Sequence, residues 1–340
     1  MVLRCLTVCA VAFFLATSII RADEPDADKV LDRFVGAWKN DIARKDPEAP
    51  QGRKLTSDEV VAKSLKGRFL IGREMNPKSD VKFMWFMARD LDGKGYTLTY
   101  FNTKGLLGTE WKGTWDEASG TLTSKSSDAP ASWSSEAVNR FVGKDKVEAN
   151  AWMKNDKGES IFDMSLTKTR QPAEAGEKIL AAWADDAKPD AELSAELKVL
   201  DRLAGTWDVT ALSKKAEWTP EDMTIKSKVT RSWVLNRTFL QDISSSDDGT
   251  ESIALITYDA KRKEYRSWWF SSPGYTSKST GQWDAASQTL RTTSTLPDGQ
   301  TSAGSVQFTD NDHHVWKVLI TDAGGKVYFD CEWKCVRAKP

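Results

Sequence analysis

Apolar and polar residues alternate along most of this chain, in short segments that are separated by turn residues. This pattern is typical of antiparallel β-strands. The segment SIALITYDAKRKEYRSWWF (252–270) predicts two strands joined by a turn, and HVWKVLITDAGGKVYFDCEW (314–333) predicts a second hairpin around Gly324 and Gly325. Hairpins that follow one another without helical crossovers predict a meander. Closure of that meander into a barrel would remove its unpaired edges.

This pattern occurs twice along the chain. The repeat can be followed through three pairs of segments: VLDRFVGAWKN and VLDRLAGTWDV (30–40 and 199–209), GTWDEASGTL and GQWDAASQTL (113–122 and 281–290), and IFDMSLTKTR and YFDCEWKCVR (161–170 and 328–337). Two copies of one domain therefore account for most of the 340 residues. The sequence predicts an all-β protein with two antiparallel barrels in tandem, over residues 23–170 and 191–340.

The first 22 residues do not fit this pattern. Arg4 precedes an apolar run from Cys5 to Ile20, and the small residue Ala22 follows before acidic sequence. This arrangement predicts a signal peptide over residues 1–22, and hence a secreted or periplasmic protein without a membrane span after cleavage. A retained anchor is the alternative, but the apolar run is shorter than the roughly 20 residues of a spanning helix.

Residues 171–190 connect the two copies and are rich in Ala, Glu and Lys. They predict a helical linker, and a flexible tether is an equally good interpretation. Each copy is also preceded by apolar residues at helical spacing, which predict a short amphipathic helix that caps one end of its barrel. These apolar residues are Val30, Leu31 and Phe34 before the first copy, and Leu193, Leu197 and Leu200 before the second.

The last strand of each copy gives a register. Alternation places Phe329, Cys331, Trp333 and Cys335 on one face, and Phe162, Met164 and Leu166 take the matching places in the first copy. The shared apolar face is predicted to point inward. Cys331 and Cys335 would lie about 14 Å apart on one strand, which is too far for a disulfide.

Two features then suggest a family. Gly36-Ala37-Trp38 and Gly205-Thr206-Trp207, each at the start of a first strand, resemble the Gly-x-Trp opening of lipocalin-type (calycin) barrels. In that family the Trp closes one end of the barrel beneath an Arg from the last strand, and Arg170 and Arg337 stand at the matching places. The resemblance therefore assigns barrel closure to Trp38 with Arg170 and to Trp207 with Arg337.

The whole repeat is similar to a bacterial secreted family known as domain of unknown function 1579. Membership would imply a lipocalin-like barrel and no established activity. With this resemblance the predicted fold is two tandem lipocalin-like β-barrels, each with an N-terminal capping helix.

Candidate catalytic chemistry is sparse. The only histidines are His313 and His314, which are adjacent and face opposite sides of one strand, and the first copy has no histidine. A zinc site from His314, Cys331 and Cys335 is disfavoured, because a Cys-x-x-x-Cys strand spreads its thiols apart. No phosphate-binding Gly-rich loop or dinucleotide motif occurs. We expect no catalytic residues, no metal and no cofactor, and an enzyme is the least favoured interpretation.

Fifteen tryptophans are the most unusual feature of the composition, and most of them should fill barrel interiors. An aromatic lumen predicts a small apolar or aromatic ligand; a scaffold or interaction module with packed interiors is the alternative. The formal net charge of −1 argues against nucleic acid as a partner, and the sequence does not identify a protein partner. The candidate lumen residues are Trp268, Trp316, Trp333, His314, Phe329, Phe162 and Met164.

Overall fold

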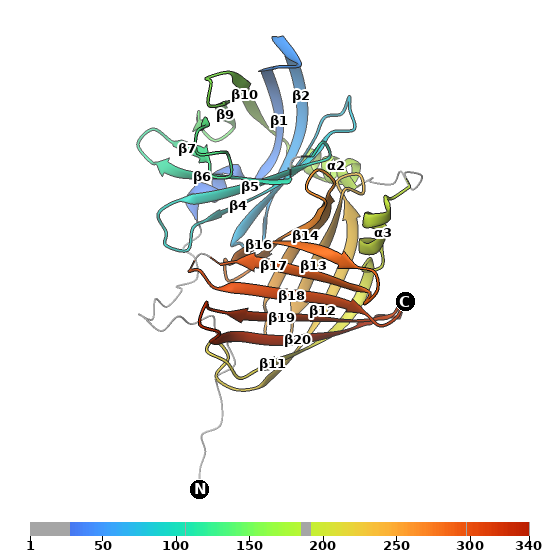
Figure 1. Ribbon diagram of the computed structural model, residues 1–340. Helices are drawn as coiled ribbons and strands as arrows, with labels where there is room; N and C mark the ends of the chain where they lie inside the picture. Colours follow the sequence, from blue (N-terminus) through green and yellow to red (C-terminus); the bar gives the residue numbers. More distant parts are fainter. Residues whose placement is uncertain (1–27, 106, 185–191, 297, 340) are drawn as a thin grey trace. The chain divides into compact units, whose positions relative to one another are not determined.

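The computed structural model describes residues 28–105, 107–184, 192–296 and 298–339 (Figure 1). Within them the chain forms two closed antiparallel barrels of ten strands each. The prediction of an all-β chain with two tandem barrels is confirmed. The signal peptide predicted for residues 1–22 and the end of the predicted linker, residues 185–190, lie outside the described residues.

The first barrel is an up-and-down meander in which each strand pairs with the next, and β1 also pairs with β10 to close the sheet. Its strands are β1 (Gly36–Asp46), β2 (Ala49–Ser64), β3 (Phe69–Met75), β4 (Lys82–Arg89), β5 (Tyr96–Asn102), β6 (Leu107–Asp116), β7 (Thr121–Ser126), β8 (Ser134–Phe141), β9 (Lys146–Lys154) and β10 (Ser160–Gln171).

The second barrel has the same topology and closes through the pairing of β11 with β20. Its strands are β11 (Gly205–Lys214), β12 (Met223–Val234), β13 (Phe239–Ser246), β14 (Glu251–Asp259), β15 (Glu264–Ser271), β16 (Thr276–Asp284), β17 (Thr289–Thr295), β18 (Thr301–Phe308), β19 (His313–Thr321) and β20 (Val327–Arg337).

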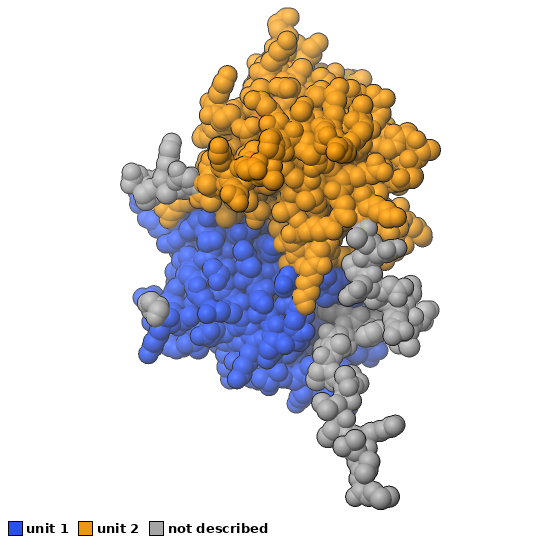
Figure 2. All heavy atoms as spheres, turned by 180° about the vertical axis from the view of Figure 1, so that it is seen from behind, with its two compact units in different colours: residues 1–22, 192–233, 239–340 blue, residues 23–191, 234–238 orange. Residues whose placement is uncertain are grey.

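The described chain divides into two compact units, which Figure 2 colours separately. One unit contains the first barrel together with residues 234–238. The other contains residues 192–233 and 239–339, which carry the second barrel. Each unit has an apolar interior cluster of its own.

A short helix precedes each barrel, as predicted. Helix α1 (Lys29–Phe34) begins at Asp28, whose carboxylate accepts hydrogen bonds from the backbone N–H groups of Val30 and Leu31. Its apolar residues are buried in the interior cluster of the first barrel. Helix α3 (Ala195–Asp201) places Leu200 in the equivalent cluster of the second barrel. Both helices therefore cover one end of a barrel with apolar side chains.

Part of the predicted linker is a helix, α2 (Ala173–Ala184), which packs on the outer face of the first barrel. Ile179 joins Ala37 and Val60 in a small apolar cluster on that face. The Trp183 ring lies under the guanidinium of Arg73, with the Arg73 Cζ 5.6 Å from the ring centroid. The described part of the linker is thus helical and attached to the first barrel.

Candidate functional site

One end of the first barrel is closed by an arginine stacked on a tryptophan. The Cζ atom of Arg170 lies 4.1 Å from the ring centroid of Trp38, which is 1% exposed. Arg170 also donates hydrogen bonds to the backbone carbonyls of Val35 (2.6 Å) and Arg33 (3.0 Å), while Trp38 Nε1 donates to Phe34 O (2.8 Å). These bonds tie the last strand to the end of α1. This is the geometry that the resemblance to calycin barrels implies.

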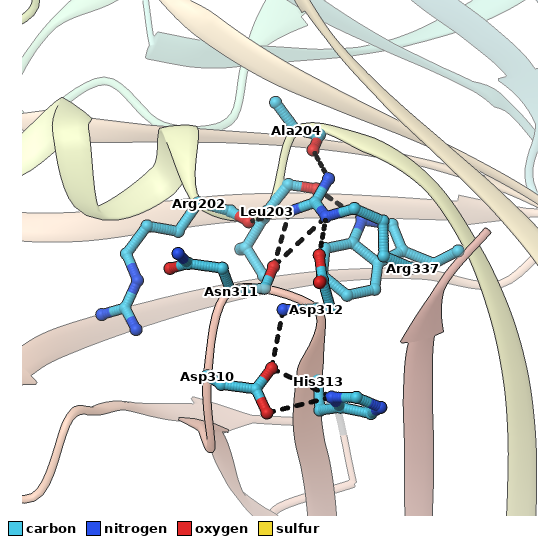
Figure 3. Close-up of polar contacts among 9 residues, drawn as sticks. Arg202, Leu203, Ala204, Asp310, Asn311, Asp312, His313 and Arg337 are labelled. Atoms are coloured by element: carbon cyan, nitrogen blue, oxygen red, sulfur yellow. Dashed lines mark hydrogen bonds and ion pairs between the residues drawn. The ribbon is translucent and has the colours of Figure 1, made fainter. Parts of the chain in front are cut away.

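The second barrel repeats this closure (Figure 3). The Cζ atom of Arg337 lies 4.3 Å from the ring centroid of Trp207, and Trp207 Nε1 donates to Leu203 O at 2.7 Å. Arg337 donates to the carbonyls of Ala204 (2.6 Å) and Arg202 (3.1 Å). The backbone partners of each arginine are therefore equivalent in the two barrels.

Steric constraints explain why each Gly-x-Trp begins with glycine. Gly36 and Gly205 adopt φ angles of 135° and 116°, a region that favours glycine. A Cβ atom at either position would overlap Nη1 of the closing arginine, Arg170 or Arg337. The space that glycine leaves is the space that the guanidinium occupies.

A second arginine explains why the VLDR segment occurs twice. Arg33 lies over Trp115 at 5.2 Å, and Arg202 lies over Phe308 at 3.9 Å. The two arginines hold equivalent places in the repeat, as do the aromatic residues beneath them, Trp115 with Trp283 and Phe141 with Phe308. The repeated sequence therefore encodes the closed ends of the barrels.

The inward faces of β19 and β20 carry an aromatic wall. Trp316 and Trp333 are opposite each other on β19 and β20, and their rings stack with centroids 4.8 Å apart and an interplanar angle of 29°. The ring centroid of Phe329 lies 6.2 Å from that of Trp333. All three side chains are half-buried, so the wall keeps accessible surface. Three of the candidate lumen residues thus lie together.

A polar cluster lies one inward position deeper, beside this wall. Arg231 and Asp242 form an ion pair at 2.6 Å, with exposed side-chain fractions of 6% and 14%. Nη1 of Arg231 lies 3.2 Å from Nε2 of His314. Because arginine can only donate, Nε2 of His314 must accept, and the neutral ring carries its hydrogen on Nδ1. That buried Nδ1 has no hydrogen-bond partner among the described residues.

The surroundings keep His314 neutral. Burial, together with the charges of Arg231 and Arg337, lowers the pKa of His314 to about 3. Its ring lies edge-on to Trp207, with centroids 4.3 Å apart. Cys335 pairs with His314 across the strands, and burial raises the pKa of its thiol to about 11. His314 is therefore a neutral donor at physiological pH, and Cys335 is an unreactive thiol.

The prediction for Trp268 is wrong. Tyr265 belongs to the interior cluster of the second barrel, and alternation along β15 then points Ser267 and Trp269 inward. Trp268 lies on the outer face, with its ring centroid 6.3 Å from that of Phe239 and beneath Arg266. The neighbouring Trp269 takes the inward position and is half-buried there.

Phe162 and Met164 lie in the other barrel, so they form no site with the residues above. Both are half-buried on the inward face of β10, toward the end of the strand that is remote from Arg170. The Arg44 guanidinium lies 5.7 Å from the Phe162 ring centroid. The first lumen has no stacked tryptophan pair at this level, because Leu166 and Ala149 stand where the second barrel has Trp333 and Trp316.

The interior of the first barrel carries a different polar cluster. Glu59 is fully buried and accepts hydrogen bonds from Trp85 Nε1 (2.8 Å) and Lys168 Nζ (2.6 Å). Nearby, Asn40 donates to Ser57 Oγ at 3.1 Å, and Ser57 donates to Glu74. This interior therefore holds two carboxyl groups, and among the described residues Lys168 is the one ammonium group that contacts either of them.

Gly72 makes room for this arrangement. It faces Trp85 across the strands, and a Cβ at this position would overlap the indole ring. In the second barrel the equivalent pair is Asp242 and Ala254, so the larger side chain lies on β13 and the smaller one on β14. The ring in one barrel and the carboxylate in the other use the same part of the lumen.

Glu74 and Tyr100 are half-buried on the inward faces of β3 and β5, so both keep some accessible surface. Burial is the main reason why the pKa of each is raised, and the charge of Glu59 is the next cause. Both side chains therefore prefer their uncharged forms more than exposed ones do.

Comparison with known proteins bears on the second barrel. Residues 192–331 match the family model described as protein of unknown function (DUF1579). This confirms the resemblance noted in the sequence. The DUF1579 match includes the Gly-x-Trp opening and ends before Arg337, whose stacking on Trp207 is seen only in the structure. A comparison with curated proteins gave no match.

Solved structures similar to this chain include Rv2717c from M. tuberculosis, at 15% identity over 44% of this chain and 100% of that one, with a TM-score of 0.35. An S-type phycobiliprotein lyase from Guillardia theta is 14% identical over 45% of this chain and 97% of that one, with a TM-score of 0.32. A protein of unknown function from the DUF3598 family of Nostoc punctiforme is 9% identical over 91% and 98%, with a TM-score of 0.28.

Two further checks concern metals and membranes. Among the described residues, no group of three or more His, Cys, Asp or Glu side chains is placed to hold a metal ion. Cys331 and Cys335 are free, buried thiols, so the expectation that they form no disulfide with each other is confirmed. None of the helices in the described ranges is long and apolar enough to cross a membrane.

The sequence reasoning missed the buried charged residues in both lumens. Glu59 alternates with Ser57 and Val61 on β2, and Glu74 alternates with Leu70 and Gly72 on β3. A charged residue at an inward position of a barrel strand was the available signal. The repeat could not reveal it, because the second copy has Val229 and Ser244 at these places.

Proposed function

We propose that the second barrel binds a small, flat, apolar molecule that carries a hydrogen-bond acceptor. The ring system would pack against Trp316 and Trp333, and the acceptor would reach the N–H groups of His314 and Arg231. The observation that carries this proposal is the half-buried stacked pair Trp316–Trp333, one strand position away from the unpartnered Nδ1 of His314. Ligand pockets combine apolar walls with a few placed polar groups in this way.

An acceptor group suits the electrostatics of this lumen. His314 is neutral and holds its hydrogen on Nδ1, and Arg231 is positively charged. A buried donor without a partner costs free energy, on the order of 1–3 kcal/mol, which a ligand acceptor would recover. A carboxylate or carbonyl on an aromatic ring therefore fits better than an amine.

The proposal extends to the compartment. We propose that residues 1–22 direct export, on the strength of the charged start and the apolar run in the sequence. N-terminal sequencing of the protein isolated from its host tests this. A chain that begins after Ala22 agrees with it, and a chain that retains residues 1–22 contradicts it.

The ligand proposal is tested with 2-naphthoate on the full folded chain, by calorimetry and tryptophan fluorescence. We expect saturable binding that Trp333→Leu weakens at least about fivefold, since an aromatic contact contributes about 1 kcal/mol. His314→Val, which installs the residue of the first barrel, should weaken binding of naphthoate more than that of naphthalene. Trp152→Leu removes an outward-facing indole and serves as the matched control.

The scaffold interpretation makes the opposite forecast. Naphthoate and naphthalene would both fail to bind, and native mass spectrometry of the protein from its host would show no retained small molecule. Equal affinity of the wild-type chain and Trp333→Leu for naphthoate would also show that the ligand does not pack against the aromatic wall.

A further inference from the structure

The interior of the first barrel carries a second site, of opposite chemistry, that the proposal above does not use. We propose that it binds the primary ammonium group of a small molecule with an apolar body, through Glu74, Asn40 and Glu59. The site lies in another barrel and shares no residue with the lumen of the second, so either proposal can fail without the other.

The first argument is an uncompensated acid. Lys168 lies 2.6 Å from Glu59 with a side chain that is 12% exposed, so one carboxylate of the pair has its counterion. Glu74 has hydrogen bonds with the side chains of Ser57 and Asn40, and the charge of Lys168 acts on it, but among the described residues no cation lies close enough to form an ion pair with it. An ammonium group would supply the charge that the second carboxyl lacks.

The second argument is a buried acceptor without a donor. Asn40 is 1% exposed and belongs to the inward face of β1, level with Ser57 and Lys168 in the register. Its amide nitrogen donates to Ser57, whereas its Oδ1 has no hydrogen-bond partner among the described residues. Buried polar atoms are rarely left unpaired, so this oxygen is available to accept a hydrogen bond from a ligand once Glu74 is ionised.

The third argument is accessibility. Glu74 and Tyr100 point into the first barrel and are only half-buried, so both keep accessible surface. The inward faces of β1 and β10 add half-buried apolar side chains, namely Ile42, Phe162 and Met164. A ligand with an ammonium head and an apolar body would match the acid at depth and the apolar walls nearer the opening.

The fourth argument is that the site belongs to one barrel alone. The equivalents of Asn40, Glu59 and Lys168 in the second barrel are Val209, Val229 and Cys335. Three neighbouring polar positions of the first barrel are thus all occupied by smaller or apolar residues in the second. A set of residues that is present or absent as a unit is expected of a site rather than of a barrel framework.

Binding at this site should release a proton. Burial and the nearby charge of Glu59 raise the pKa of Glu74, so this carboxyl keeps its proton to a higher pH in the empty site than an exposed glutamate does. An arriving ammonium favours the ionised form. The charged or titratable groups that face the site are Glu59 on β2, Glu74 on β3, Tyr100 on β5 and Lys168 on β10, with Arg44 nearer the opening.

The test uses n-hexylammonium with the full chain, in isothermal titration calorimetry at one pH in two buffers of different ionisation enthalpy. We expect binding at least about tenfold tighter than for n-hexanol, with net proton release. Glu74→Gln keeps the shape and should lower the ammonium affinity at least about tenfold and abolish the proton release. Glu148→Gln removes the same charge from the outer face of the same barrel and should change neither.

Asn40→Leu provides a second variant that leaves both carboxyl groups in place. It should weaken hexylammonium and leave hexanol unchanged. Three outcomes would each overturn the proposal. The first is equal affinity for hexylammonium and hexanol, and the second is no binding of hexylammonium at millimolar concentration. The third is equal affinity of the wild-type chain and Glu74→Gln for hexylammonium. Circular dichroism of each variant shows whether it is folded.

Discussion

The two barrels share their closed ends and differ in their interiors. Each closed end has a Gly-x-Trp, a stacked arginine and a short helix, held by hydrogen bonds to equivalent carbonyls. The interiors differ in their polar groups: the first has two carboxyl groups with one lysine, and the second has an arginine with a neutral histidine and one aspartate. The duplication therefore kept the part that closes a barrel and changed the part that a ligand would meet.

The exchange between the interiors is reciprocal. Where one barrel has a polar or charged side chain, the other has an apolar or small one at the same register position. The pairs, first barrel before second, are Asn40 and Val209, Glu59 and Val229, Lys168 and Cys335, Val61 and Arg231, Gly72 and Asp242, and Val147 and His314. Each polar cluster thus fits an environment that the other barrel does not have.

Truncation of the closing tryptophan should have the largest effect on stability, and the effect should be similar in the two barrels. Trp38→Ala and Trp207→Ala each remove an indole that is at most 1% exposed, and each should cost about 3–5 kcal/mol of unfolding free energy. Urea unfolding of the full chain, followed by circular dichroism, measures both. A cost below about 1 kcal/mol at one position would show that the two closures are not equivalent.

The next effect concerns the first interior alone. Gly72→Ala forces Trp85 away from Glu59 and should destabilise the chain by about 2–3 kcal/mol. In a Trp85→Leu background the same substitution should cost little, because the ring that it meets is gone. An equal cost in both backgrounds would locate the strain elsewhere.

The two interiors should also respond to pH with opposite sign. The pKa of His314 is about 3 in the folded chain, below its ordinary value of about 6.5. Between these values the unfolded chain binds the extra proton, so stability is lost as the pH falls. The loss should reach about 2 kcal/mol at pH 5 and be absent in His314→Val. A parallel pH profile for the two chains contradicts this.

Glu74 gives the opposite slope. Its pKa is raised in the folded chain, so the folded state holds the proton more tightly and stability is lost as the pH rises above about 4.5 toward the folded pKa. Glu74→Gln should therefore gain stability relative to the wild-type chain as the pH rises. The Glu148 carboxylate accepts hydrogen bonds from Lys146 and Arg140, which lower its pKa, so Glu148→Gln should instead lose stability relative to the wild-type chain as the pH rises.

The smallest effect concerns the aromatic wall. Trp333→Leu removes the stack on Trp316, which should cost about 1 kcal/mol, and makes this level of the second barrel resemble Leu166 in the first. Leu166→Ala is the comparison at the matching position. Unfolding free energies at neutral pH test this. If the stack stabilises the barrel, Trp333→Leu lowers the unfolding free energy. If the wall serves binding alone, the substitution leaves it unchanged.

The fold was accessible from the sequence because alternation and the repeat are local signals. They located the equivalent residues of the two copies and the inward face of β20, and the resemblance supplied the closing role of Trp38 with Arg170 and of Trp207 with Arg337. Adjacent tryptophans carry no such signal by themselves, and only the parity set by Tyr265 shows that Trp269 faces the lumen. The Glu59, Glu74 and Arg231 clusters depend on strands far apart in the chain, so no local pattern shows which groups meet.

The pairs Gly72–Trp85 and Asp242–Ala254 also restrict the order in which one interior could have arisen from the other. A Cβ at position 72 already overlaps the Trp85 ring, so Asp opposite Trp would not fit with the ring where it lies. Gly opposite Ala would leave the volume of the ring empty. A laboratory conversion of the first interior into the second therefore has to remove the ring before it adds the acid.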